Sequence, residues 1–234
     1  GVMCPSFRAT GDEKDLTRGR ANSLRLALSG QLGPNALTSD DMYDSMALCV
    51  GCKGCKRECP TGVDMARMKT EFLYHYRQRH GLSLFDKLVA FLPRYAAIAS
   101  AFGWLLNLRN KIPGLPAIGQ LVTGFAANQP LPAWSDRPFR DDEVGADTTG
   151  TEVVLWADTF NRWFEPENVR AARRVLEAGG FRVHMALPAD KGRPLCCGRT
   201  FLAAGLVDEA RMEARRVLDS LGPYVKRGVP IVGL

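Results

Sequence analysis

Residues 49–60 of this 234-residue chain read CVGCKGCKRECP. The four cysteines follow the spacing C-x2-C-x2-C-x3-C, and a proline comes directly after the last of them. This spacing is typical of thiolates bound around a [4Fe–4S] cluster. Gly51 and Gly54 lie in the two-residue gaps, where they lower the steric cost of curling the backbone. The stretch therefore predicts an electron-carrying iron–sulfur centre.

The fourth ligand of that cluster is expected from outside the run. In two-cluster ferredoxins the last cysteine of such a run binds the other cluster. Cys4 precedes Pro5 and so has the same Cys-Pro context as Cys59. The expected ligands of the first cluster are Cys4, Cys49, Cys52 and Cys55. Cys59 would bind a second cluster, with three cysteines upstream of Gly1, because the chain opens without an initiator methionine and looks cut from something longer.

Zinc and disulfides are alternative uses of these cysteines. Structural zinc usually takes two C-x2-C pairs separated by a longer loop, whereas here three cysteines share one run. The chain has seven cysteines, an odd number, and no secretory segment is visible. A reducing cytoplasmic setting therefore fits better than a disulfide framework. A cluster with a purely structural role, and a metal-stabilised interaction module, stay as further alternatives.

Charge and hydropathy limit the partners. The formal net charge is +6, but Lys and Arg are interspersed with Asp and Glu, so we expect no nucleic-acid partner. No segment has the roughly twenty continuous apolar residues of a spanning helix. The nearest candidate, residues 95–108, is interpreted as a packed core helix. The alternative is an apolar surface helix that contacts a membrane or a partner. In that case we expect the protein to associate peripherally with the inner face of the membrane.

Hydrophobic periodicity predicts an all-α first domain over residues 1–82. Helices are expected over residues 16–30, from Ser39 to the cysteine run, and over residues 63–79. Their expected inward-facing residues are Ala21, Leu24 and Leu28 in the first, Met42, Met46 and Ala47 in the second, and Met65, Met68, Phe72 and Tyr76 in the third. The opposite face of the first helix is expected to carry Arg18, Arg20 and Arg25. Lys53, Lys56 and Arg57 surround the cysteine run, where cations would raise the potential of a cluster.

The rest of the chain changes character. Residues 83–150 are expected to form a helical connector broken by prolines, with a linker over residues 130–150. The expected strands are residues 153–156, 181–187 and 229–232, and the expected helices are residues 166–178 and 206–221. This β-α-β order predicts an open parallel sheet covered by helices, over residues 151–234. The predicted fold class is α+β.

A second cysteine site follows the second predicted strand, where the sequence reads Cys196-Cys197-Gly198. Functional groups in open parallel sheets gather where strands end. Adjacent cysteines can bind a metal cluster, form a vicinal disulfide or simply be buried, and Arg193 and Arg199 would lower their thiol pKa values. Cys196 and Cys197 are therefore candidate metal ligands or redox thiols. His75, His80 and His184 are isolated in the sequence and predict no hydrolytic site.

Four segments carry a resemblance to a known family. They are residues 3–10 (MCPSFRAT), residues 17–21 (TRGRA), the cysteine run, and residues 194–199 (PLCCGR). Together they resemble the iron–sulfur portion of FAD-linked D-2-hydroxy acid dehydrogenases, which are similar to D-lactate and D-2-hydroxyglutarate dehydrogenases. The resemblance implies a helical ferredoxin-like domain followed by a truncated cysteine-rich CCG domain. It also implies an upstream flavin domain and two clusters in the intact protein, one of them on this fragment.

The sequence departs from the family pattern in the second domain. Residues 156–160 (WADTF) lack the cysteine expected one β-α-β unit before the pair, and a later C-x-x-C is absent.

The resemblance implies electron transfer from a reduced FAD domain to an acceptor such as a quinone or a cytochrome, with the fragment alone not catalytic. The alternatives are an iron–sulfur subunit of a glycolate oxidase or glycerol-3-phosphate dehydrogenase type complex, and a thiol redox protein similar to heterodisulfide reductase.

Overall fold

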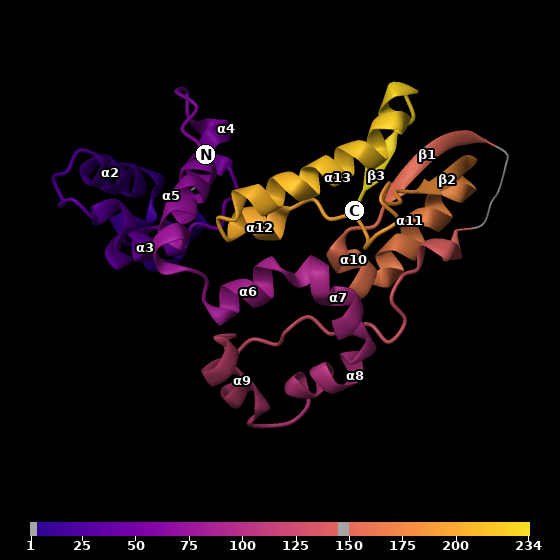
Figure 1. The fold of residues 1–234 in the computed structure, drawn as a ribbon, viewed down its shortest axis with the longest axis horizontal. Helices are drawn as coiled ribbons and strands as arrows, with labels where there is room; N and C mark the ends of the chain where they lie inside the picture. The colour runs from indigo at the N-terminus through magenta and orange to yellow at the C-terminus, as the bar shows by residue number, and fades with distance from the viewer. Residues whose placement is uncertain (1–3, 145–149) are drawn as a thin grey trace. The chain divides into compact units, whose positions relative to one another are not determined.

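The computed structural model describes residues 4–144 and 150–234 (Figure 1). The chain divides into two compact units, one of residues up to Ser83 together with Phe201–Val207, and one of Leu84–Thr200 and Asp208–Leu234. Mixed helix and sheet confirm the predicted class in outline. Residues 145–149, part of the expected linker, and Met3, part of the first family-like segment, lie outside the described residues.

The first unit is helical, as predicted. Its helices are α1 (Pro5–Thr10), α2 (Thr17–Leu28), α3 (Asp40–Ala47), α4 (Gly54–Glu58) and α5 (Met65–His80), with 3-10 turns η1 (Glu13–Asp15) and η2 (Ala36–Thr38). Side-chain caps begin two of them: Ser39 Oγ accepts from the N–H of Met42 at 3.3 Å, and Asp64 Oδ1 accepts from the N–H of Arg67 at 3.1 Å. Each cap satisfies a backbone donor that the first helical turn leaves unpaired.

The core of this unit is made by one face of each long helix. Its buried members include Leu24, Met42, Met46, Met65, Phe72 and Tyr76, all of which the periodicity predicts. The prediction is wrong for three other residues, because Leu28, Ala47 and Met68 are exposed. It is also wrong for Arg20, which is fully buried. Leu28 and Ala47 are the last residues of their helices, where the chain already turns away from the core.

The second unit begins with short helices. They are α6 (Leu84–Ala90), α7 (Leu92–Ala101), α8 (Gly103–Leu106), the 3-10 turn η3 (Asn107–Asn110) and α9 (Leu115–Thr123). Pro93 and Pro116 stand in the first turns of α7 and α9, where a missing N–H leaves no bond unmade. Pro93, Ala96 and Gly103 are buried, whereas most large apolar side chains of this segment face outward.

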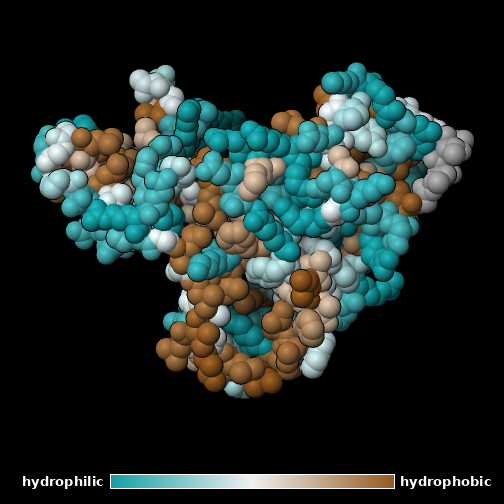
Figure 2. All heavy atoms as spheres, in the orientation of Figure 1, coloured by the Kyte–Doolittle hydropathy of each residue, from teal (hydrophilic) through white to brown (hydrophobic). Residues whose placement is uncertain are grey.

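Residues 95–108 are therefore not a packed core helix, and that interpretation is wrong. Figure 2 shows apolar residues gathered over α8 and α9. We call the exposed side chains of Ile98, Phe102, Trp104, Ile118 and Leu121 the α7–α9 surface. Leu121 is 88% exposed. Among the described residues, the helices are all too short or too polar to cross a membrane.

A three-stranded parallel sheet organises the rest of this unit. The remaining elements are η4 (Asp141–Glu143), β1 (Thr151–Trp156), α10 (Thr159–Trp163), α11 (Pro166–Ala178), β2 (Phe181–Met185), α12 (Arg199–Ala203), α13 (Val207–Lys226) and β3 (Ile231–Gly233). The strand order is β2-β1-β3, with Val153 opposite Val183 and Val154 opposite Ile231.

Helices cover both faces of the sheet, as predicted. On one face Val153 and Leu155 pack with Val169 of α11, and on the other Val154 packs with Leu221 of α13. Alternate residues of β1 thus face opposite layers. Because both faces are buried, this central strand reads as the near-continuous apolar run that parallel sheets require.

The expected linker takes part in this core. Phe139 is 1% exposed and packs with Val153 and Val169, and its N–H donates to the carbonyl oxygen of Arg162 at 2.9 Å. The buried Arg162 in turn donates to Asp141 at 2.7 Å. Residues around Phe139 are therefore an integral part of the second unit.

Replacing Phe139 by alanine tests this packing. We expect a loss of about 3–5 kcal/mol in the free energy of unfolding of the second unit, since a large buried side chain is removed and the cavity only partly closes. Chemical denaturation followed by circular dichroism measures the loss. Phe102→Ala is the matched control, because Phe102 is 55% exposed. Equal effects of the two substitutions would contradict the packing role.

Candidate iron–sulfur site

The backbone of the cysteine run turns sharply at two left-handed residues. Gly51 has φ +64° and Lys53 has φ +59°. Gly51 meets the expectation, because a residue without a Cβ adopts a left-handed conformation at little steric cost. Gly54, in contrast, is the first residue of helix α4. Lys53 takes the second left-handed position, at about 1–2 kcal/mol for a residue with a Cβ. The run therefore holds a conformation that its own local preferences do not favour at Lys53.

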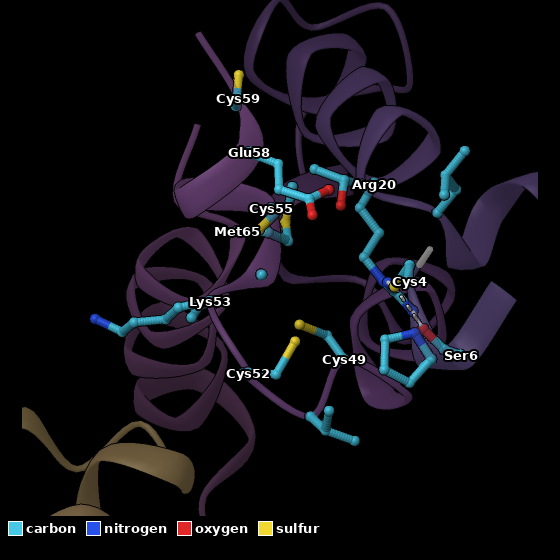
Figure 3. A pocket seen from close by; sticks show the side chains of 17 residues that line it. Cys4, Ser6, Arg20, Cys49, Cys52, Lys53, Cys55, Glu58, Cys59 and Met65 are labelled. Atoms are coloured by element: carbon cyan, nitrogen blue, oxygen red, sulfur yellow. Dashed lines mark hydrogen bonds between the residues drawn. The ribbon is translucent and has the colours of Figure 1, made fainter. Parts of the chain in front are cut away.

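Five cysteines line one cavity of about 290 Å³ in the first unit (Figure 3). They are Cys4, Cys49, Cys52, Cys55 and Cys59. Cys4 comes from the residue before α1, Cys55 from α4, and the others from loops. Cys49 and Cys55 pack against the hydrophobic core, while Cys52 is exposed. Two segments that are far apart in the sequence thus bring thiols to one space.

Cys59 differs from the other four in its direction. Figure 3 shows its sulfur pointing away from those of Cys49 and Cys52. Its Sγ lies 3.1 Å from Thr61 Oγ1, and hydrogen bonds from Thr61 and from the backbone N–H of Val63 lower the pKa of the Cys59 thiol. The geometry separates the last cysteine of the run from the group formed by the others.

Sequence reasoning missed the residue that packs behind Cys4. Arg20 of α2 is fully buried and donates from Nη1 toward Cys4 Sγ at 3.6 Å. Burial acts to raise the pKa of the Cys4 thiol, but hydrogen bonds from Ser6, the backbone N–H of Phe7 and Arg20 together lower it. The signal was present in the sequence, because Arg20 precedes Leu24 by four residues and Ala27 by seven and so shares their buried face.

Of the cations expected around the cysteine run, Lys53 lines the cavity, but its amine is not directed at the thiols. Lys53 and Lys56 pair with Asp64 at 3.7 and 3.3 Å, and Figure 3 shows the Lys53 amine pointing away from the cysteines. Lys69 of α5 instead donates to the carbonyl oxygen of Cys49 at 2.7 Å, and burial lowers its pKa. Arg20 and Lys69 are therefore the cations in contact with cysteine residues of the cavity.

The vicinal cysteines of the second unit lie in the loop after β2, as predicted. Cys196 is buried and Cys197 is exposed. Gly198 has φ +78°, and a Cβ there would come within 3.0 Å of the carbonyl oxygen of Ala210, so glycine is required. Its N–H donates to Cys196 Sγ at 3.4 Å.

The two thiols of this pair differ in acidity. Their mutual hydrogen bond raises the pKa of Cys196, to which burial adds, and lowers that of Cys197. The expected effect of Arg193 is wrong, because its guanidinium pairs with the buried Glu213. Cys197 is left as the more acidic and more accessible thiol.

Within residues 4–144 and 150–234, no three His, Cys, Asp or Glu side chains converge closely enough to hold one metal ion. The histidines make local contacts: His75 with Glu71, His80 with the carbonyl oxygen of Thr38, and His184 with Glu152.

Comparisons with known proteins find relatives among iron–sulfur proteins. Residues 2–63, which lie within the first unit, match the model of the 4Fe-4S dicluster domain. The whole chain is 26% identical to a D-2-hydroxyglutarate dehydrogenase of Pseudomonas putida, and 84% of it is 24% identical to the one of Escherichia coli. It is also 22% identical, over 99% of its length, to the glycolate oxidase iron-sulfur subunit of Escherichia coli.

These relatives confirm the expected resemblance to the iron–sulfur part of an oxidoreductase. The chain spans 27% and 20% of the two dehydrogenases and 52% of the oxidase subunit, so it corresponds to only part of each. No solved structure matches the chain.

Alkylation tests the asymmetry of the vicinal cysteines. In the native protein we expect iodoacetamide to modify Cys197 and to leave Cys196 untouched. Because the pKa of Cys197 is lowered, its alkylation rate should rise with pH and level off below about pH 8.5, the ordinary pKa of a cysteine thiol. Fragment-ion mass spectrometry separates the two sites. Equal modification of both in the native protein would contradict the asymmetry, and unfolded protein provides the reference in which both react.

Proposed function

We propose that this chain transfers electrons through a [4Fe–4S] cluster held by Cys4, Cys49, Cys52 and Cys55. The observation that carries the proposal is that these four cysteines, from two distant segments, line one cavity. When bound, such a cluster takes up and releases one electron at a time. The resemblance to a ferredoxin-like helical domain and to a truncated CCG domain belongs to the same proposal.

The protein contributes shielding and charge to this site. Cys49 and Cys55 rest on the hydrophobic core, which keeps water from one side of the cavity, while exposed Cys52 leaves the other side accessible. Burial and hydrogen bonding of the ligand sulfurs are the usual determinants of cluster potential. An accessible edge suits exchange of electrons with a partner.

The relatives, named as D-2-hydroxyglutarate dehydrogenases and a glycolate oxidase iron-sulfur subunit, support a proposal for the electron donor. We infer a donor flavin, FAD, in a domain or subunit that oxidises a D-2-hydroxy acid, and an acceptor such as a quinone or a cytochrome. The flavin would carry the substrate chemistry, and this chain the onward transfer. A separate iron–sulfur subunit in a glycolate oxidase type complex is the alternative arrangement.

Cysteine substitutions test the ligand set. In the intact protein prepared anaerobically, we expect Cys4→Ala to lose the iron, the sulfide and the absorption near 400 nm of one cluster. Cys49→Ala should give the same loss, since removing a ligand opens the cluster to solvent. Iron and sulfide analysis with electron paramagnetic resonance of the reduced protein measures both. A Cys4→Ala protein with the full iron content would refute the remote ligand.

Cys59 provides the companion test. Its direction away from the other thiols supports a role in a second cluster, completed by cysteines outside this chain. We expect Cys59→Ala to remove a different cluster, so that the two variants lose distinguishable resonance signals. Cys196→Ala serves as the matched control for these substitutions, because this buried cysteine belongs to the second unit. Loss of the same signal in the Cys4 and Cys59 variants would contradict two separate clusters.

A second candidate function is attachment to a membrane surface. The α7–α9 surface exposes Trp104 and four aliphatic or aromatic neighbours, which single helices of this length cannot bury alone. Between Asp86 and Asp136 the sequence contains no acidic residue, while Lys87 and Lys111 are exposed cations. We infer that this surface rests on an anionic bilayer, with apolar side chains at the headgroup level. The site would then lie on the inner face of the membrane.

Vesicle binding tests this surface. The intact protein should sediment with phosphatidylglycerol vesicles, less so at high salt, and only weakly with phosphatidylcholine vesicles. We expect Trp104→Ser with Leu121→Ser to reduce binding at least tenfold, because exposed apolar anchors are removed. Leu218→Ser on α13 is the control, since Leu218 is about as exposed as Trp104, at 69% and 66%, but lies outside the α7–α9 surface. The intact protein would fail to bind if another part of the protein covered this surface, and that result would refute the inference.

A further inference from the structure

Arg20 stands out among the residues that the proposed function does not yet use. It is the largest fully buried side chain of the first unit and it carries a permanent charge. We propose that Arg20 is a positioning residue that holds Cys4 at the cavity and raises the reduction potential of the cluster bound there. This inference rests on the proposed ligand set, because it concerns the sulfur of Cys4.

The guanidinium uses all five of its N–H groups. Nε donates to the carbonyl oxygen of Ser45 at 2.8 Å. Nη1 donates to the carbonyl oxygen of Asp15 at 2.6 Å and to Cys4 Sγ at 3.6 Å. Nη2 donates to Ser6 Oγ at 3.0 Å and to Asp15 Oδ1 at 3.4 Å. A guanidinium has five such donors in a fixed plane. One of them is therefore committed to the ligand sulfur.

These contacts join the segments that carry the ligands. Ser6 and Asp15 belong to α1 and η1, which follow Cys4, and Ser45 belongs to α3, which leads into Cys49. Ser6 Oγ also donates to the carbonyl oxygen of Asp15 at 2.9 Å and lies 3.2 Å from Cys4 Sγ. Arg20 thus connects the remote cysteine to the segment before the cysteine run through hydrogen bonds.

Close packing brings Arg20 to this position. A Cβ on Gly19 would come within 2.0 Å of the carbonyl oxygen of Glu13, so only glycine lets α2 approach η1 this closely. The same approach buries Asp15, which is 1% exposed, beside Arg20, which is 0% exposed. Asp15 Oδ2 finds no hydrogen-bond partner among the described residues. Arg20 is therefore the group that compensates the buried charge of Asp15.

The effect on the cluster has a definite sign. A cluster that takes up one electron, here from the reduced flavin of the proposed donor, gains one negative charge that its thiolates share. A hydrogen bond from a cation to a ligand sulfur is stronger in that reduced state, because the sulfur is more negative. Arg20 thus favours the reduced form and raises the potential. Lys69, which is half-buried, donates to the carbonyl oxygen of Cys49.

Redox titration of the intact protein tests the inference. We expect Arg20→Lys, which keeps the positive charge but not the planar set of N–H donors, to lower the equilibrium constant for reduction of one cluster about tenfold. This change corresponds to a reduction potential lower by ~59 mV for one electron. Arg20→Gln, which also loses the charge, should lower it further. The second cluster should not shift. Arg18→Gln is the matched control, because it removes one charge from the same helix at a side chain that is 80% exposed, and it should leave both potentials unchanged.

A second measurement tests the inference without an Arg20 variant, in case those variants fail to assemble a cluster. In protein labelled with ¹⁵N-arginine, the reduced cluster should show a nitrogen hyperfine coupling that follows the label and persists in Arg18→Gln. Absence of a label-dependent coupling, or an unchanged potential in Arg20→Lys with full iron content, overturns the inference. A wild-type protein without iron refutes the proposed function instead, so the two failures are distinguishable.

Discussion

The structure depends on bringing Cys4 to the same cavity as a cysteine run that lies far along the chain. The run itself presents cysteines to this cavity, and Cys4 joins them from the first residues of the described chain. The connection is made by a buried guanidinium, with Arg20 linking the segment after Cys4 to α3. A charge in the core needs a complete set of partners to be tolerated, and the helices of the first unit pack so as to supply them.

This arrangement gives the site two unlike sides. Core residues such as Met46 and Met65 lie behind Cys49 and Cys55, and exclude water there. Exposed Cys52 and the loop around it remain accessible. A one-electron carrier benefits from both, because a low-dielectric wall strengthens every hydrogen bond to sulfur, and an open edge allows a partner to approach.

The second unit combines a conventional scaffold with unusual surfaces. Its parallel sheet is buried on both faces and supports the loop that presents Cys196 and Cys197. Glu213, buried behind this loop, pairs with Arg193, and so the arginine that could have acted on the thiols stabilises the scaffold instead. The α7–α9 surface, in contrast, is left without a covering layer among the described residues.

Local patterns in the sequence determined much of this protein. The helices and strands follow from hydrophobic periodicity, and the kind of site follows from the spacing of Cys49, Cys52 and Cys55, because both depend on neighbours within a few residues. Only the tertiary structure decided that Arg20 is buried, that Phe139 joins a core, and that apolar residues of α7 to α9 face outward. These outcomes depend on which elements pack together, and no local pattern contains that information.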